Sequence, residues 1–204
     1  MLFFITGNKD KFLEIKKELP EIEQLDVDLP EIQDIDPKAI IEAKLKAAFA
    51  HYKGEFIPLE TGRPKAAVAV TASGRSLTGF IVEDTSFLLS CINGLPGPFA
   101  KWFLKALGRE GVYNLCGKMG NYEAFGKTII GFARSPQDIH FFEGSIKGTI
   151  VAPRAESGFG WDPIFVPDGH EKSFSEMSTE EKNGISHRGT ALKKLLAFLQ
   201  ESTK

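Results

Sequence analysis

The chain has 204 residues, of which 42% are hydrophobic and 25% charged, a balance typical of a folded globular protein and not of a disordered chain. Its formal net charge of −2 argues against bulk binding of nucleic acid, because proteins that follow a phosphate backbone usually carry a large basic excess. No apolar run approaches the ~18 residues of a membrane span. Cys91 and Cys116 lack a CxxC partner, which favours a reduced, cytoplasmic compartment. We therefore expect one domain over residues 1–204, without a membrane or nucleic acid as partner.

Strands and helices alternate in the first half of the chain. Residues 2–5 form an apolar run, and apolar residues then recur at helical spacing over 12–19. Residues 25–29 alternate as a second strand, and Asp36–Pro37 is typical of a helix start, with aspartate as the N-cap and proline in the first turn. The helix that follows has an apolar stripe. Lys44 lies within that stripe, where an unpaired charge is costly.

In the second half of the chain the predicted strands cluster. Residues 54–78 contain several Gly, Pro, Ser and Thr residues and are predicted to form an inserted hairpin or a long loop. The remaining predicted elements are a strand over 79–85, a helix over 99–107, strands over 127–133 and 139–151, and a last helix from residue 186. This order indicates an α/β fold with a mixed sheet and not a pure doubly wound one.

The turn after the first strand, Thr6–Lys11, is a candidate phosphate-binding segment. The two commonest nucleotide signatures, GxxxxGK[ST] and GxGxxG, do not occur in the sequence. A helix N-terminus presents unpaired N–H groups, Gly7 allows close approach of the backbone, and the lysines of the turn add positive charge. The ordinary alternative is a helix cap made by Asn8 without any ligand.

Glu83 and Asp84 follow an apolar run, where carboxylates lose hydration unless they meet a cation or hydrogen-bond donors. Magnesium typically takes one or two protein carboxylates and completes its shell with water and phosphate oxygens, so Glu31 is a candidate second ligand. The alternative is that the two acids are solvated at the end of a strand and paired with nearby lysines.

Two segments near the C-terminus, 157–163 and 181–189, combine aromatic, acidic and cationic side chains between glycines. Phe159 and Trp161 offer flat faces for a base or sugar, and the glycines around them favour an exposed recognition loop. Lys182, His187 and Arg188 are donors suited to oxo groups and phosphates. The alternative is that the rings are core aromatics, and that His187 and Arg188 are exposed cations behind a serine cap.

Together, these segments resemble the inosine triphosphate pyrophosphatases, Ham1-like enzymes that cleave non-standard purine nucleoside triphosphates to the monophosphate and pyrophosphate. Each segment alone is modest evidence, but six in this order are highly specific, and they span nearly the whole chain. They are Thr6–Lys11, Leu29–Glu31, Glu83–Thr85, Gly94–Trp102, Gly158–Pro163 and Glu181–Arg188. The chain departs from the family pattern between 54 and 78, where family members usually have a much shorter link.

The resemblance implies an elongated mixed sheet with two α/β lobes, a cleft between the lobes, and commonly a homodimer. Glu31 and Asp84 would hold Mg²⁺, with Mn²⁺ as a substitute, and Asp84 would also be the base. The residues that would face the triphosphate are Thr6, Gly7, Asn8, Lys11, Lys44 and Lys101. Thr85 would contact the substrate, and the base and sugar would be surrounded by Phe159, Gly160, Trp161, Asp162, Lys182, Ser186, His187 and Arg188.

The implied reaction is hydrolysis of ITP, dITP and XTP, which cleanses the nucleotide pool. A water deprotonated at Asp84 would attack the α-phosphorus while lysines stabilise the departing pyrophosphate. A 6-oxo group would accept hydrogen bonds near Lys182 and Arg188, where the 6-amino group of adenine would face donors.

Two alternatives to this hydrolase remain. The first is a purine-nucleotide or RNA sensor that binds without hydrolysis and stacks bases on Phe159 and Trp161. Against it, a pure anion binder has no reason to aim Glu31 and Asp84 at phosphates. The second is an aspartyl-phosphate phosphatase, which usually needs a second acid two residues after the nucleophile, where this chain has Ser86.

Overall fold

The computed structural model describes residues 2–27, 29–51, 79–156 and 158–201, so the predicted insert at 54–78 lies outside the described residues. Within those ranges one mixed sheet forms. Its strands are β1 (Leu2–Ile5), β2 (Ile22–Leu25), β3 (Gly79–Leu89), β4 (Pro96–Gly97), β5 (Glu123–Ser135), β6 (Asp138–Ile150) and β7 (Phe165–Pro167). The α-helices are α1 (Lys9–Glu18), α2 (Pro37–His51), α3 (Ala100–Met119), α4 (Thr179–Ile185) and α5 (His187–Glu201). The predicted α/β class with a mixed sheet is confirmed.

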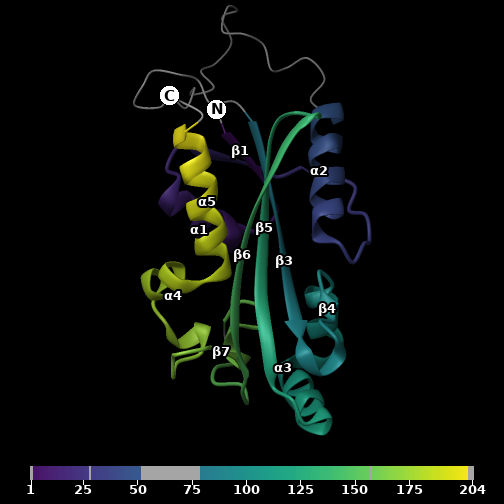
Figure 1. Cartoon of the computed structure of the whole chain (residues 1–204), viewed down its shortest axis with the longest axis vertical. Helices are drawn as coiled ribbons and strands as arrows, with labels where there is room; N and C mark the ends of the chain where they lie inside the picture. Colours follow the sequence, from purple (N-terminus) through teal and green to yellow (C-terminus); the bar gives the residue numbers. More distant parts are fainter. Residues whose placement is uncertain (1, 28, 52–78, 157, 202–204) are drawn as a thin grey trace, which may run out of the picture.

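Long antiparallel strands run the length of the molecule, which is elongated (Figure 1). The strand order is β2-β1-β3-β5-β6-β7, and β4 pairs with β3 off this path. β1 is parallel to β2 and β3, whereas β3, β5, β6 and β7 pair antiparallel. Helices α1 and α5 lie on one side of the sheet and α2 on the other (Figure 1). None of the described helices is long and apolar enough to cross a membrane.

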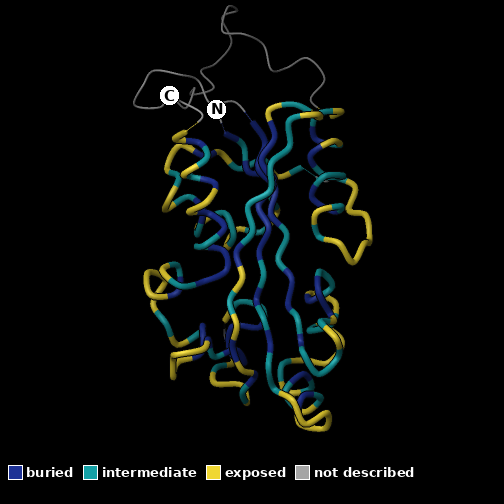
Figure 2. Tube along the Cα trace, viewed as in Figure 1, coloured by how far each residue is buried: buried dark blue, intermediate teal, exposed yellow. Residues whose placement is uncertain are grey.

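The side chains of β3 alternate between the two faces of the sheet, and this alternation organises the cores. Ile81 packs in a cluster with residues of β1, α1 and α5, whereas Phe80 and Val82 pack against α2. Farther along the strand, Phe87 and Leu89 belong to a third cluster, which contains residues of α3 and Trp161. Buried residues follow the sheet and the inner helix faces, whereas the exposed residues lie on the outside (Figure 2).

Between these apolar clusters, β3 carries a polar stretch, Glu83–Ser86, which we call the waist. The parallel register pairs Phe4 with Ile81, so the chain leaves β1 alongside the start of the waist. On the other side, β5 pairs with β3 without interruption from Phe80 to Leu89. The waist is therefore paired with β5 along one edge and lies between β1 and β4 along the other, with apolar cores toward both ends of the molecule.

Three predicted boundaries are wrong, each for a physical reason. The strand predicted over 79–85 continues to Leu89, because pairing with β5 satisfies the backbone through the polar stretch, so Glu83 and Asp84 lie within a strand and not at its end. The second strand occupies Ile22–Leu25 and not 25–29, because its parallel register with β1 pairs Ile22 with Leu2 and Leu25 with Ile5. The helix predicted over 99–107 runs over Ala100–Met119, across a kink at Gly108, whose φ of 69° suits glycine.

Candidate active site

The turn after β1 is a capped helix start that aims a lysine at the waist. The Thr6 hydroxyl accepts a hydrogen bond from the Asn8 N–H at 3.1 Å, and the Asn8 side chain accepts from two N–H groups of α1 at 3.0 and 3.1 Å. The helix cap considered as the ordinary interpretation is therefore present. Gly7 lies between them, where an added Cβ would come 3.3 Å from an aspartate side chain. Lys11, in the first turn of α1, places Nζ 3.2 Å from Glu83 Oε1.

On the α5 side of the waist, Glu83 is held by cations. Arg188 donates to it from Nε to Oε2 at 2.8 Å and from Nη2 to Oε1 at 3.0 Å, and the Thr85 hydroxyl donates at 2.8 Å. Burial alone would raise the pKa of Glu83, but the charges of Arg188 and Lys11 outweigh it and hold the pKa well below its usual range. Glu83 is therefore an ionised, buried group with lysine pairing, and the predicted alternative of a solvated carboxylate is wrong.

On the α2 side of the waist, Asp84 has an unpaired oxygen. Asp84 lies two residues after Val82 in β3, so it is on the same face of the sheet, and Val82 packs against α2 on that face. Within the described part of the chain, its buried Oδ2 has no hydrogen-bond partner. Burial raises the pKa of Asp84, while the positive charges of Lys11 and Lys44 oppose that rise. The carboxylate is thus desolvated and close to cations, as a group that binds a metal or a proton would be.

Glu31 completes this side of the site together with two predicted lysines. Lys44, from the apolar stripe of α2, donates a hydrogen bond to Glu31, and this bond lowers the pKa of Glu31. The charge of Lys101, at the start of α3, lowers the pKa of Glu31 further. The negative charge of Glu31 in turn contributes to the raised pKa of Asp84. Two carboxylates with a free oxygen fit a hard divalent cation, which takes its other ligands from water and phosphate. Groups of three or more potential metal ligands do not occur among the described residues.

The predicted exposed platform is wrong for Trp161. Its side chain is only 6% exposed, and its ring stacks on Phe87 at a centroid distance of 4.7 Å and an angle of 10°. The rings of Phe165 and His187 also lie close to it, at centroid distances of 5.0 and 5.2 Å. Trp161 is a core aromatic because its large apolar area is more stable away from water. Phe159 is half-buried, next to Gly160, and remains the candidate for stacking on a base.

The cations of the last two helices are buried in a network of ion pairs, so the predicted alternative of exposed cations is wrong. Lys182 Nζ lies 2.7 Å from Asp162 Oδ2 and 3.3 Å from Glu14 Oε1, and Glu14 also accepts from Arg188. Burial raises the pKa of Asp162, and Lys182 opposes that rise. Glu83 and Glu14 therefore offset the charge of Arg188 at the start of α5. Glu14 was missed from the sequence, although it lies one helical turn after Lys11 and so on the same face of α1.

The first residues of α5 fix the helix against the Trp161 region. Ser186 Oγ accepts a hydrogen bond from the Gly189 N–H at 3.0 Å, which is the predicted serine cap. His187 is 2% exposed, and burial, followed by the charge of Arg188, lowers its pKa well below the usual value. His187 is therefore a neutral ring, and its buried Nδ1 has no partner within the described residues.

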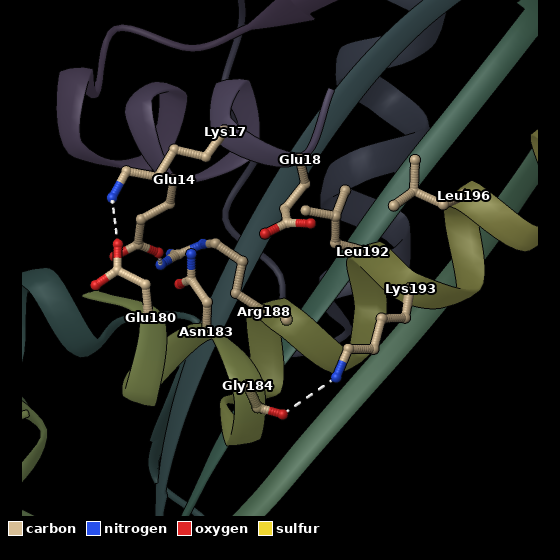
Figure 3. A pocket seen from close by; sticks show the side chains of 11 residues that line it. Glu14, Lys17, Glu18, Glu180, Asn183, Gly184, Arg188, Leu192, Lys193 and Leu196 are labelled. Carbon is tan, nitrogen blue, oxygen red and sulfur yellow. Dashed lines mark hydrogen bonds and ion pairs between the residues drawn. The ribbon is translucent and has the colours of Figure 1, made fainter. Parts of the chain in front are cut away.

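A pocket of about 390 Å³ lies between α1, α4 and α5 (Figure 3). Glu14 and Arg188, which belong to the buried network of ion pairs, line one side of the pocket. Lys17 and Glu180 form an ion pair across it, with Nζ 3.4 Å from Oε1. None of its lining residues comes from the Asp84 side of the waist. This pocket is therefore not the predicted cleft between lobes, which stays a prediction.

The fold and the waist suit one class of protein, the class that binds a phosphate ligand together with a divalent cation. Two carboxylates and three lysines, contributed by separate elements, converge on a buried strand beside a capped helix start. Such a group of opposite charges suits a ligand that carries both phosphates and a divalent cation.

Comparison with known proteins identifies the family. The model of the Ham1 family matches residues 2–198, and the chain belongs to this family. It is 37% identical to an inosine triphosphate pyrophosphatase of Schizosaccharomyces pombe, covering 98% of this chain and 95% of that protein. It is 36% identical to the protein of the same name in Saccharomyces cerevisiae, covering 98% and 96%. The solved structure of the Staphylococcus aureus Ham1 protein matches with a TM-score of 0.73 at 23% identity, covering 99% of this chain and all of that chain, and supports the fold. The resemblance read from the six segments is confirmed.

Proposed function

We propose that this protein hydrolyses non-standard purine nucleoside triphosphates, namely ITP, dITP and XTP, to the monophosphate and pyrophosphate. One observation carries the proposal: Asp84 is a half-buried carboxylate whose buried Oδ2 has no partner among the described residues, and it lies among Lys11, Lys44 and Glu31. The two yeast relatives, named inosine triphosphate pyrophosphatases, support the same activity at 36–37% identity. The sensor alternative has no comparable observation in its favour, because it gives no role to the unpaired oxygen.

In this proposal the waist supplies the chemistry. Glu31 and Asp84 would hold Mg²⁺, or Mn²⁺ in its place, and the bound ion would offset the charge of the phosphates. Asp84 accepts a proton from water as the water oxygen bonds to the α-phosphorus and the bond to the bridging oxygen of the β-phosphate breaks. Lys11, Lys44 and Lys101 stabilise the negative charge that passes to pyrophosphate. Phosphate would draw Lys44 away from Glu31 and Lys11 away from Glu83, because its charge competes with the two carboxylates for the ammonium groups.

The buried network would recognise the base. A lysine ammonium has three N–H donors, and Lys182 uses two of them on Asp162 and Glu14. The remaining donor can meet a 6-oxo group, whereas the 6-amino group of adenine would leave two donors facing each other. A mismatch of this kind discriminates by about 10⁴ in favourable cases. Phe159 would stack on the ring, and Thr85 would contact the substrate from β3.

The deciding experiment incubates the protein with ITP, dITP, XTP, ATP or GTP and identifies the products by chromatography. Each substrate is tested with Mg²⁺, with Mn²⁺ and with EDTA. We expect monophosphate and pyrophosphate from ITP, dITP and XTP, little turnover of ATP, and no turnover with EDTA. Release of orthophosphate, or equal turnover of ATP, would overturn the proposal. Binding of ITP without products would favour the sensor. The homodimer and the cytoplasmic location stay predictions.

A further inference from the structure

Arg109, a residue of α3 that no sequence motif singled out, is bonded to the loop that carries Phe159. Its Nε donates to the carbonyl oxygen of Gly160 at 3.0 Å, Nη1 to that of Glu156 at 2.8 Å, and Nη2 to that of Gly158 at 2.6 Å. One guanidinium thus engages three backbone carbonyls of a single loop. Hydrogen bonds from a charged donor are roughly twice as strong as neutral ones.

The loop needs such a constraint because its two glycines have access to more backbone conformations than other residues. Gly158 and Gly160, on either side of Phe159, have φ values of 126° and 52°, in the region that favours glycine. The loop carbonyl of Phe159 accepts a hydrogen bond from the N–H of Asp162 at 3.0 Å. Asp162 in turn is paired with Lys182. The conformation of the loop is therefore transmitted to the residues that would read the base.

Arg109 is well placed for this because it comes directly after the kink of α3. Gly108 has φ 69° and ψ 173°, so the helix axis breaks one residue before the arginine. The planar fork of a guanidinium fits several carbonyls at fixed angles, which the ammonium of lysine cannot do.

We propose that Arg109 is a positioning residue for base recognition: it sets the conformation of the 158–160 loop and so places Phe159 and Asp162 against the nucleobase. Arg109 would act through the loop and not by direct contact with the phosphates or the reacting atoms. The inference rests on the proposed function for its kinetic consequence, but the loop contact can be tested without any substrate.

The kinetic test compares Arg109→Gln and Arg109→Lys with a matched control. Lys118→Gln removes the same charge from the exposed last turn of the same helix. We expect KM for ITP to rise about tenfold in Arg109→Gln, with a smaller change in kcat, partial recovery in Arg109→Lys and no change in the control. Inhibition by the two products tests the base-binding part and the phosphate-binding part of the site separately. Inosine monophosphate should inhibit Arg109→Gln more weakly than the unsubstituted protein, whereas pyrophosphate, which has no base, should inhibit both equally.

The substrate-free test uses tryptophan fluorescence. Chain positions 102 and 161 hold the two tryptophans, so Trp102→Phe leaves Trp161, beside the loop, as the sole reporter. In that background we expect acrylamide to quench Trp161 more strongly when Arg109→Gln is added.

The possible outcomes are distinct. A folded Arg109→Gln protein with unchanged KM, unchanged inhibition by inosine monophosphate and unchanged quenching would overturn the inference. A fall in kcat alone, with a lowered Tm, would show that Arg109 only stabilises the fold and would overturn it equally. Failure of the unsubstituted protein to hydrolyse ITP would overturn the proposed function instead, and the positioning of the base with it, while stronger quenching would still support the loop contact.

Discussion

Arg188 and Glu83 form a buried, two-point ion pair between residues 105 positions apart, with Nε 2.8 Å from Oε2 and Nη2 3.0 Å from Oε1. Neither side chain is more than 4% exposed. Because both charged groups are buried away from water, removal of one would leave the other without its main counter-ion. The pair joins β3 to α5 at the waist.

Glu83→Gln should destabilise the fold by about 3 kcal/mol, because it leaves Arg188 buried with Glu14 as its remaining acidic partner. Urea denaturation followed by circular dichroism measures the free energy of unfolding. The control is Glu180→Gln, which removes an exposed carboxylate paired with Lys17 and should leave that free energy unchanged. Equal stability of the two variants would show that the buried pair contributes no more than a surface pair.

Asp84→Asn should lower kcat for ITP by about 10²–10⁴, because the amide cannot accept the proton from water. Binding of a non-hydrolysable ITP analogue, measured by calorimetry, should persist. Asp138→Asn makes the same chemical change at the start of β6, away from the waist, and should keep native kcat. Native turnover in Asp84→Asn would remove this residue as base and as metal ligand.

Trp161→Ala should destabilise the protein by about 3–5 kcal/mol, because it empties a site packed between Phe87, Phe165 and His187. The matched variant is Trp102→Ala, whose ring is 57% exposed and whose loss should change stability by about 0.5 kcal/mol or less. Thermal denaturation of both variants gives the comparison. A stable Trp161→Ala protein with weakened ITP binding would instead restore the exposed platform predicted from the sequence.

Gly144→Ala should destabilise the protein by about 1–3 kcal/mol and also lower activity. A Cβ at this position of β6 would lie 2.0 Å from the carbonyl oxygen of His187 and 2.7 Å from the backbone nitrogen of Ala191. Since both are helix backbone, α5 would have to move, carrying Arg188 with it. Gly184→Ala, in α4, meets nothing within 4 Å and should be neutral or slightly stabilising. The free energy of unfolding and ITP turnover of the two variants are the measurements.

Alkylation should distinguish the two cysteines. Burial raises the pKa of the Cys116 thiol to about 12, so roughly one thiol in 10⁴ is ionised at pH 8. Cys91 is half-buried, with its sulfur 3.8 Å from that of Cys116. Brief treatment with iodoacetamide followed by peptide mass spectrometry should find the label on Cys91 first, whereas the urea-unfolded protein should label at both positions. Faster labelling of Cys116 in the folded protein would contradict this burial.

Local sequence patterns were sufficient for elements whose boundaries are local. The apolar run at 2–5 and the Asp36–Pro37 helix start were placed correctly, because hydrophobic spacing and helix capping act over a few residues. The second strand was misplaced because its position is set by its register with β1. The strand containing Glu83 was cut short because polar residues were taken to end it. Its continuation depends on β5, some 45 residues farther along the chain.

The site residues also divide into those that local sequence patterns indicated and those that depend on distant parts of the chain. Asp84 and Lys44 were singled out because an acid after an apolar run and a lysine in an apolar stripe are locally anomalous, and Glu31 was added as a second carboxylate for Mg²⁺. The structure brings the three within electrostatic range of one another, and their roles stay predictions. The partners of Arg188 and Lys182 were not found, since Glu14 and Glu83 are more than 100 positions away in the chain. Trp161 was misjudged because local glycines indicate an exposed loop, whereas its burial depends on Phe87 and His187.

The uninterrupted pairing of β3 with β5 also governs how the waist exchanges its amide hydrogens. From Phe80 to Leu89 each residue of β3 has a partner on β5, including the acids between the apolar cores. Alternate residues of an antiparallel strand donate their N–H groups to the partner strand, and a strand packed between cores opens only in large cooperative units. Deuterium uptake at the N–H groups of residues 83–86 that bond to β5 should therefore be slow and insensitive to nucleotide, whereas the slowing of exchange on binding should fall in the helices and loops that face the waist.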